Sequence, residues 1–272
     1  MKKIIYIIPF VIMLLLTIPV SAQDEAMSAY WDEVDFTDTT LVGSKMLEDK
    51  MVGFFFSFTD GDIQRFDSLS VEGLGVLLGK AKVNMRVYEY VLEFALNGYT
   101  AMGRDAVTDY LLNYPRLAEG EIMREQGLRL DSIAAPYQKV RVGTKAPDYT
   151  GVTIDEKPYQ LYASQAPKTI VVFWSTDCEY CHDFLVQMRR HLDLKTDFEL
   201  VTFALAESQE ELARAVRKMR LPGYHFYDEL RWEGKAFLDY HITSTPTVFV
   251  LDENKTIVCK PYDWQELKDW LK

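Results

Sequence analysis

The sequence has few cysteines, no cluster of basic residues and no internal repeat. Its 272 residues include three cysteines, 30 lysines and arginines, and 41 aspartates and glutamates, which give a formal net charge of −11. Three cysteines are too few for a scaffold held together by disulfides. Clustered cations are needed to displace counterions from phosphates, so we expect no nucleic-acid partner. The lack of a repeat period gives no support to a helical solenoid.

The composition is that of a folded protein of moderate size. Hydrophobic residues make up 48% of the chain and charged residues 26%, a balance that excludes disorder as its overall character. At about 150 residues per domain, the length predicts two domains, each long enough to bury a core of its own.

The amino terminus has the pattern of an export signal. Two lysines precede an apolar run from Ile4 to Val20, and small residues follow up to Ala22. We therefore expect residues 1–22 to be cleaved, with the mature chain beginning near Gln23. An uncleaved anchor is the alternative, because the run approaches the shortest bilayer span.

The rest of the chain indicates where the mature protein works. No cysteine follows the apolar run, so a lipid-modified amino terminus is not expected, and no second long apolar run follows Ala22. We expect an oxidising extracytoplasmic compartment, in a bacterium the periplasm. Contact with a membrane is expected only through an uncleaved signal.

Residues 23–138 are predicted to form an all-α domain. Two stretches have apolar residues at i, i+4, i+7, i+8 and i+11, the spacing of amphipathic helices: Leu47, Met51, Phe54, Phe55 and Phe58, then Val83, Val87, Tyr90, Val91 and Phe94. A third helix is expected to stop at Pro115, and a fourth to run from about Glu119 toward Ser132. The aromatic side chains between Tyr88 and Tyr99 are interpreted as helix core.

Residues 139–272 are predicted to form an α/β domain, because strand-like runs there alternate with helical ones. Gly and Pro residues between 141 and 147 mark the change. The expected result is a mixed sheet covered by helices. We expect strands at 149–154, 159–162, 169–174, 198–205, 247–251 and 256–260, and helices at 179–192, 209–219, 232–240 and from 263.

Two of the cysteines form a C-x-x-C motif, Cys178-Glu179-Tyr180-Cys181, between an apolar strand and an amphipathic helix. A sulfur at a helix start lies beside unpaired backbone amides, whose partial positive charge favours the thiolate. Cys178 is therefore the expected nucleophile. Cys181, one helical turn further on, is the expected resolving thiol.

Other roles of this motif are weighed against the redox one. A structural disulfide would close too short a loop to contribute much stability. A zinc site would need a second pair of ligands at metal spacing, so no metal is expected. Residues 178–182 also spell C-x-x-C-H, the attachment motif of c-type haem. Haem attachment gives no account of the strand ending at Trp174 or of the Thr-Pro motif further along the chain.

That second motif, Thr245-Pro246-Thr247, precedes the apolar strand Val248-Phe249-Val250-Leu251. Together with Phe173-Trp174 and the C-x-x-C, it resembles a thioredoxin-fold domain of the TlpA/ResA-like branch. The resemblance covers about Val142 to Lys272. It implies thiol-disulfide exchange, with Pro246 cis and packed against the C-x-x-C. It also implies that the backbone of Thr245 pairs with the extended chain of a substrate.

The helical half carries a weaker resemblance. Tyr30-Trp31-Asp32 and Asp35-Phe36-Thr37-Asp38 are similar to a poorly characterised domain that precedes such thioredoxin modules in some secreted bacterial proteins. This resemblance implies no activity for the helical half.

Several positions depart from the pattern of the branch. Asp177 stands where a tryptophan is usual, and Phe184 where many members have a glutamate. Val172 occupies the place of the buried aspartate of thioredoxin. Carboxylates at 177 and 179 disfavour a thiolate at Cys178, whereas a protonated His182 favours it. We therefore expect the reduction potential of the Cys178–Cys181 couple to lie nearer to that of thioredoxin, about −270 mV, than to that of DsbA, about −120 mV. Such a protein would act as a reductant.

The sequence thus predicts an exported enzyme that reduces protein disulfides and needs no cofactor. Its expected partners are disulfide-bearing client proteins and an upstream thiol donor of electrons. Trp174, Thr245 and Pro246 are expected at the substrate, with Trp174 interpreted as a core residue as well as a platform beside the active sulfur. The alternative is a partner-binding module, in which the helical domain recognises the partner and the thioredoxin-like domain is a scaffold.

Two further interpretations concern the roles that the cysteines could have. Cys259 is interpreted as a small core residue rather than a regulatory thiol. A peroxidase is disfavoured, because Ser175 and Val171 stand where a threonine and a proline are expected before a peroxidatic cysteine.

Overall fold

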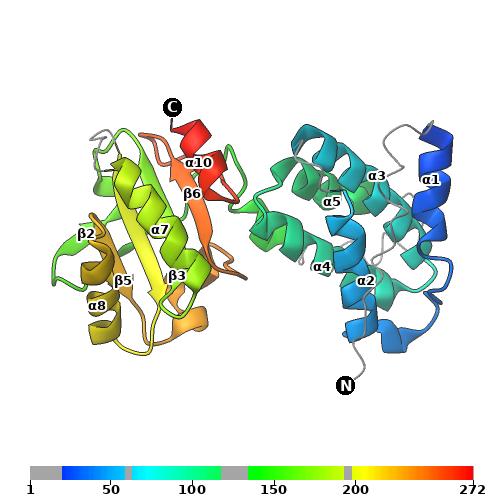
Figure 1. Ribbon diagram of the computed structural model, residues 1–272, viewed down its shortest axis with the longest axis horizontal. Coiled ribbons are helices and arrows are strands. Elements are labelled where there is room, and N and C mark those ends of the chain that lie inside the picture. Colours follow the sequence, from blue (N-terminus) through cyan, green and yellow to red (C-terminus); the bar gives the residue numbers. More distant parts are fainter. Residues whose placement is uncertain (1–19, 59–62, 118–133, 193–197, 272) are drawn as a thin grey trace, which may run out of the picture. The chain divides into compact units, whose positions relative to one another are not determined.

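The computed structural model describes residues 20–58, 63–117, 134–192 and 198–271 (Figure 1). The chain divides into two compact units, Met1–Ala95 and Leu96–Lys272. The boundary that the sequence predicts between 138 and 139 lies inside the second unit and stays a prediction. Most of the expected export signal and the helix expected over 119–132 lie outside the described residues.

The first unit is built from helices, as the amphipathic patterns predict. They are α1 (Val20–Ala29), the short 3-10 helix η2 (Thr39–Leu41), α2 (Lys45–Phe56), α3 (Ile63–Ala81) and the start of α4 (Met85–Ala101). Helix α2 begins after Ser44, whose hydroxyl oxygen accepts a hydrogen bond from the N–H of Leu47. The expectation that Val83 is buried is wrong, because it lies in the turn before α4 and is 66% exposed.

Aromatic side chains form the core of the first unit around Trp31, which is fully buried. Its ring lies 5.0 Å from that of Phe54 and 6.0 Å from that of Phe36, measured between centroids. The carboxylates of Asp35 and Asp38 accept hydrogen bonds within their own turns. The two motifs that carry the weaker resemblance therefore have structural roles here.

The second unit contains a mixed five-stranded sheet in the order β5-β4-β3-β6-β7. Strands β3, β4 and β5 are parallel, and β6 is antiparallel to both β3 and β7. The strands are β3 (Thr169–Ser175), β4 (Glu199–Leu205), β5 (Tyr224–Tyr227), β6 (Thr247–Leu251) and β7 (Ile257–Cys259), and a hairpin of β1 (Thr150–Val152) and β2 (Pro158–Gln160) precedes them.

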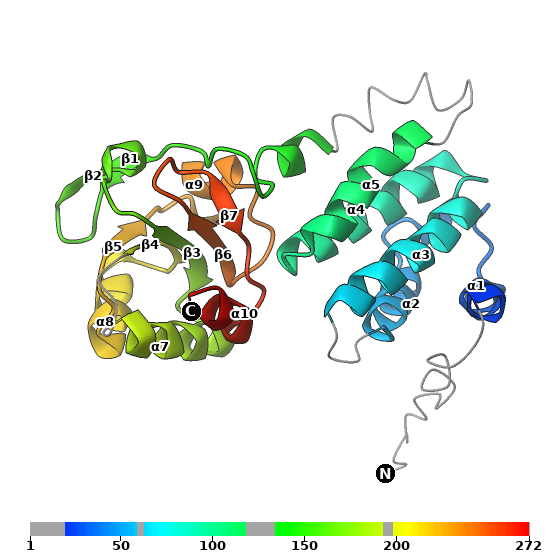
Figure 2. The ribbon, with the colours of Figure 1, turned by 90° about the horizontal axis from the view of Figure 1, so that it is seen from above.

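Helices cover both faces of the sheet because the side chains of β3 alternate between two cores. Val172 and Trp174 face the core made with α7 (Glu179–Leu192), α8 (Gln209–Met219) and α10 (Trp264–Trp270). Phe173 faces the other core, with α9 (Lys235–Asp239). Figure 2 shows α7, α8 and α10 on one side of the sheet and α9 on the other. This confirms the predicted mixed sheet covered by helices.

Helix α5 (Asp105–Leu117) and the turn before it belong to the second unit. Gly103 in that turn has φ of +63°, and a Cβ there would overlap the backbone oxygen of Lys260. Arg104 pairs with Glu266 at 2.7 Å. The turn is thus fixed to the segment around β7.

Three expectations about these elements need correction. Helix α5 runs past Pro115 to Leu117. Proline has no backbone N–H, but so close to the end of the helix this removes only one hydrogen bond. Strand β5 has no counterpart among the expected elements, since its four residues are too short for a periodic pattern. The helix expected at 232–240 is instead the 3-10 turn Arg231–Glu233 followed by α9.

The described residues also include other short elements. A 3-10 turn, Leu161–Ala163, follows β2. Within residues 20–58, 63–117, 134–192 and 198–271, no helix combines the length and the apolar character needed to cross a bilayer.

Candidate active site

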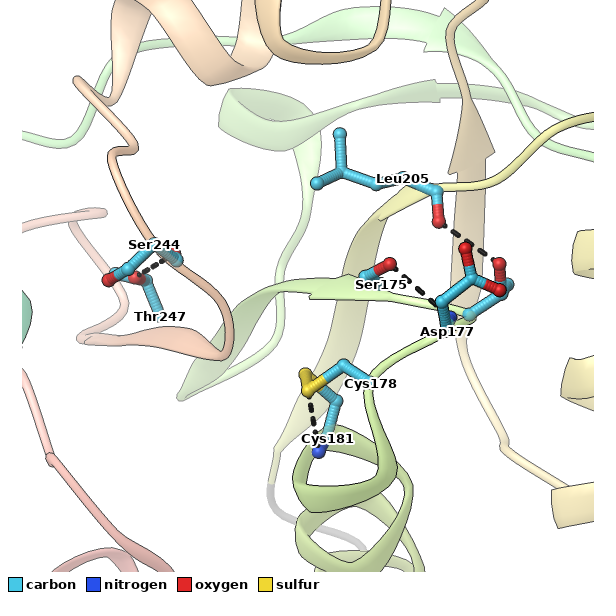
Figure 3. The surroundings of a disulfide bond; sticks show 8 residues. Ser175, Asp177, Cys178, Cys181, Leu205, Ser244 and Thr247 are labelled. Carbon is cyan, nitrogen blue, oxygen red and sulfur yellow. Dashed lines mark hydrogen bonds between the residues drawn. A yellow bond between two sulfur atoms is a disulfide. The ribbon is translucent and has the colours of Figure 1, made fainter.

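Cys178 and Cys181 form a disulfide where the chain passes from β3 into α7 (Figure 3). Their Cα atoms lie 5.2 Å apart. The sequence predicts this position from an apolar run followed by an amphipathic one. The structure therefore brings the two sulfurs together at a helix start.

Backbone hydrogen bonds hold Cys178 at the amino-terminal cap of α7. Its carbonyl oxygen accepts from the N–H of His182 at 3.1 Å, which is the first bond of the helix. Its sulfur accepts from the N–H of Cys181 at 3.0 Å (Figure 3). That N–H is one of those a helix leaves without an internal partner. The cap geometry thus directs positive partial charge at the sulfur of Cys178.

The loop before Cys178 is tied to the carboxyl end of the neighbouring strand. The N–H and the hydroxyl of Thr176 both donate to the carbonyl oxygen of Leu205, at 3.0 and 3.2 Å. The N–H of Asp177 donates to the hydroxyl oxygen of Ser175 at 3.3 Å. These bonds fix the path of the loop, and with it the position of the first sulfur.

The two cysteines differ in exposure. Cys181 is fully buried, whereas Cys178 is half-buried. Asp177 and Glu179, which flank Cys178, are exposed. A reagent arriving from solvent therefore meets Cys178 first, which agrees with the roles that the sequence predicts.

Trp174 lies in the core rather than on the surface. Its side chain is fully buried, and its ring lies 5.9 Å from that of His182 in an edge-to-face arrangement. Because the ring is not exposed, the expectation that it contacts substrate finds no support in this disulfide form. Its contribution is to pack beneath the start of α7.

The Thr-Pro motif lies beside the disulfide. The peptide bond between Thr245 and Pro246 is cis, as the resemblance implies. Strands β3 and β6 pair with Phe173 opposite Thr247, so the start of β6 adjoins the end of β3. The hydroxyl of Thr247 donates to the carbonyl oxygen of Ser244 at 2.7 Å, and Figure 3 shows this segment beside the two cysteines.

The core beneath Cys181 is apolar. Val172 is fully buried in the same cluster as Cys181. It stands where thioredoxin has a buried aspartate, so this strand position offers no proton acceptor to Cys181. His182 is half-buried, and its Nε2 atom is buried with no hydrogen-bond partner among the described residues.

Two exposed tyrosines of the second unit were not singled out from the sequence. Tyr180 is 54% exposed and Tyr262 is 46% exposed. Partial burial raises the pKa of Tyr180, and the charges of Asp263 and Tyr262 act in the same direction. The only sequence signal is the tyrosine within the C-x-x-C, since spacing cannot reveal a neighbour from the far end of the chain.

Cys259 is half-buried on β7 and packs against the core that contains Cys181. Burial raises the pKa of its thiol to about 11, and the charges of Glu266 and Asp105 act in the same direction. It lies outside the disulfide. In the part of the chain that the structure describes, no three His, Cys, Asp or Glu side chains converge as around a metal ion.

Comparisons with known proteins show which families and proteins the second unit resembles. Residues 142–260 match the AhpC/TSA family. The chain is 27% identical over 123 residues to the thioredoxin-like protein YneN of Bacillus subtilis, a match that covers 43% of this chain and 69% of that protein.

A solved structure shows the same fold. A thioredoxin-like protein from Bacteroides caccae matches with a TM-score of 0.59 at 18% identity, over 95% of both chains. The thioredoxin domain of a thiol-disulfide oxidoreductase from Bacteroides vulgatus matches over 48% of this chain and 94% of that domain, at 18% identity and a TM-score of 0.42. Residues 142–260 are thus similar to the AhpC/TSA family, and the second unit has a thioredoxin-like fold that follows a helical amino-terminal region.

Proposed function

We propose that this protein is an exported thiol-disulfide oxidoreductase that reduces disulfide bonds in client proteins. The observation that carries the proposal is the pair Cys178 and Cys181 at the start of α7, with one sulfur half-buried and the other fully buried. An outside disulfide can meet only the first sulfur. The second lies where it can react with a mixed disulfide that forms on the first.

The reaction transfers two electrons from the dithiol to the client. The thiolate of Cys178 attacks one sulfur of the client disulfide, forms a mixed disulfide and releases the other client sulfur as a thiolate, which takes up a proton. Cys181 loses its proton to solvent and attacks the sulfur of Cys178. This step forms the intramolecular disulfide and releases the second client sulfur. An upstream thiol donor then returns the pair to the dithiol form.

The edge at the start of β6 is the proposed place for the client chain. Thr245 precedes the cis proline at 246, and β6 begins at the next residue, paired with the end of β3 that leads to Cys178. An extended client segment pairs there through main-chain hydrogen bonds, which need no particular client sequence.

Export to the periplasm is part of the proposal, and it is supported by the apolar amino-terminal run that ends at Ala22. The direction of electron flow is supported by Asp177 and Glu179, whose exposed carboxylates flank Cys178 and oppose its thiolate. Because a less stable thiolate makes the dithiol less favoured, the protein acts as a reductant. Equilibration with glutathione tests this direction, and a potential above about −150 mV would contradict it.

Reduction of insulin by the Cys178→Ser variant tests the mechanism. We expect that variant to lose activity. Cys181→Ser should accumulate mixed disulfides with clients, which identifies them by mass spectrometry. Cys259→Ser is the matched control, because Cys259 lies outside the disulfide, and it should keep wild-type activity. Wild-type activity in Cys178→Ser would reject the proposal in favour of a binding module on a thioredoxin scaffold.

A further inference from the structure

A groove of about 780 Å³ lies between α7 and α8, beside the disulfide. The two helices run side by side in both views of the ribbon (Figures 1 and 2). Thr176 and His182, which flank the two cysteines in sequence, line the groove, and apolar side chains form part of its wall: Val186, Ala215 and Met219. The groove thus begins at the active-site loop and continues along the helices.

Positive charge dominates the polar lining of this groove. Four cationic side chains line it, against the single carboxylate of Glu211: Arg189, Arg214, Lys218 and Arg220. The carboxylate of Glu211 accepts a hydrogen bond from the N–H of Glu207 at 2.9 Å, so it is held by the loop that precedes α8. In a chain with a net charge of −11, this local excess of cations favours an anionic ligand.

Arg220 supports this interpretation through its backbone. It follows α8 in the left-handed conformation, with φ of +53°. Glycine adopts this conformation more readily and is the usual residue after a helix. Arginine at this position is conformationally less favourable than glycine, but its side chain adds a cation to the lining of the groove.

His182 contributes a polar atom without a partner. Its Nε2 is buried and makes no hydrogen bond within the described residues, and the residue lines the groove. A carboxylate in the groove would supply the missing partner, since a buried polar group is costly to leave unpaired.

We propose that this groove binds an acidic, extended segment of the client protein whose disulfide reacts at Cys178. The identity of the occupant rests on the proposed function. Neither cysteine lines the groove, so a small molecule filling it would not reach the sulfur, whereas a chain can span both places. Successive side chains of an extended chain point to opposite sides. Alternating acidic and apolar residues therefore match the cations and the apolar wall.

Fluorescence anisotropy tests the inference with the full chain in its oxidised form. The probe is a fluorescein-labelled peptide of alternating glutamate and leucine, compared with a peptide that has glutamine in place of glutamate. We expect the glutamate peptide to bind more tightly, and added salt to weaken it. The double variant Arg214→Gln/Lys218→Gln should bind it about tenfold more weakly, since each exposed ion pair contributes about threefold.

The matched control is Arg190→Gln/Arg217→Gln. It removes the same amount of charge, one residue from α7 and one from α8, at exposed positions that do not line the groove, and it should keep wild-type affinity. Equal losses in the two double variants, or equal binding of the two peptides by the wild type, would overturn the inference. Binding to the oxidised chain needs no thiol chemistry, so this result is independent of the insulin assay.

Discussion

The backbone N–H of Cys181 donates a hydrogen bond to the sulfur of Cys178 at 3.0 Å, while the side chain of Cys181 is fully buried. The same turn of helix thus supports the first sulfur electrostatically and hides the second. This relationship predicts how the two thiols react once the disulfide is reduced.

We expect Cys178 to be alkylated before Cys181 when the reduced protein meets limiting iodoacetamide at neutral pH. Of these two cysteines only Cys178 is open to solvent, and the thiolate that forms there is favoured by the helix amides. Fragmentation of the labelled peptide by mass spectrometry locates the label.

Cys259 provides an internal control for this experiment. Burial raises the pKa of its thiol to about 11, so it is almost entirely protonated at neutral pH and should remain unlabelled. Labelling of Cys181 ahead of Cys178 would contradict the assigned order of the two thiols.

Replacing the carboxylates beside Cys178 should raise the reduction potential. In the variant Asp177→Asn/Glu179→Gln, two negative charges that oppose the thiolate are gone, so the dithiol form becomes more favoured. We expect a rise of about 10–30 mV, the equivalent of about 0.5–1.4 kcal/mol. Equilibration with glutathione measures it.

The control for this variant is Glu253→Gln. Glu253 is exposed in the turn after β6, at the opposite end of that strand from Pro246, and its loss should leave the potential unchanged. A drop in potential in the double variant would show that the two carboxylates do not oppose the thiolate.

Asp105 and Lys260 are far apart in sequence and form an ion pair at 3.3 Å. The side chain of Lys260 is 3% exposed, so its charge needs this partner. We expect Asp105→Asn to lower the free energy of unfolding by about 2–3 kcal/mol, less than for a fully buried pair, because the side chain of Asp105 is 22% exposed.

Urea unfolding followed by tryptophan fluorescence checks this prediction, since four of the five tryptophans lie in the second unit. Asp239→Asn is the control in the same unit, because its pair with Lys235 is exposed on both sides and should contribute less than about 0.5 kcal/mol. An effect of Asp105→Asn no larger than that of the control would mean that the turn before α5 is not fixed by this pair.

His225 predicts a loss of stability in mild acid. It is buried, and its Nε2 lies 3.3 Å from the carbonyl oxygen of Leu221, which can only accept. In the neutral ring, Nδ1 then accepts from the hydroxyl of Thr202 at 2.8 Å. Burial lowers the pKa of His225, an effect that its contact with the Leu221 carbonyl partly opposes.

Because its pKa is lower in the folded state, the unfolded chain binds the proton first as the pH falls through about 6.5. The contribution of neutral His225 to the free energy of unfolding is therefore fully present above that pH. Below it, the free energy of unfolding decreases by up to about 1.4 kcal/mol per pH unit from this residue. We expect His225→Gln to reduce that slope in urea unfolding at several pH values. Some slope should remain, since burial also lowers the pKa of His241. An unchanged slope would assign the acid sensitivity elsewhere.

The sequence predicts the local structure around the reactive cysteines with good accuracy. The expected helices at 179–192 and 209–219 have the observed bounds, as does the strand at 247–251. Each has a strong periodic pattern or a capping residue, such as Ser208 before α8. Strand β5 escapes this kind of prediction, because its place beside β4 depends on pairing rather than on pattern.

The sequence by itself determined the order of elements, the redox pair and the apolar position at 172, because these depend on periodicity and on neighbours along the chain. Only the tertiary structure decided that Trp174 is fully buried, that Asp105 pairs with Lys260, and that cations line a groove beside the disulfide. These features arise between residues distant in sequence, and packing sets their distances. Local propensity carries no information about such distances.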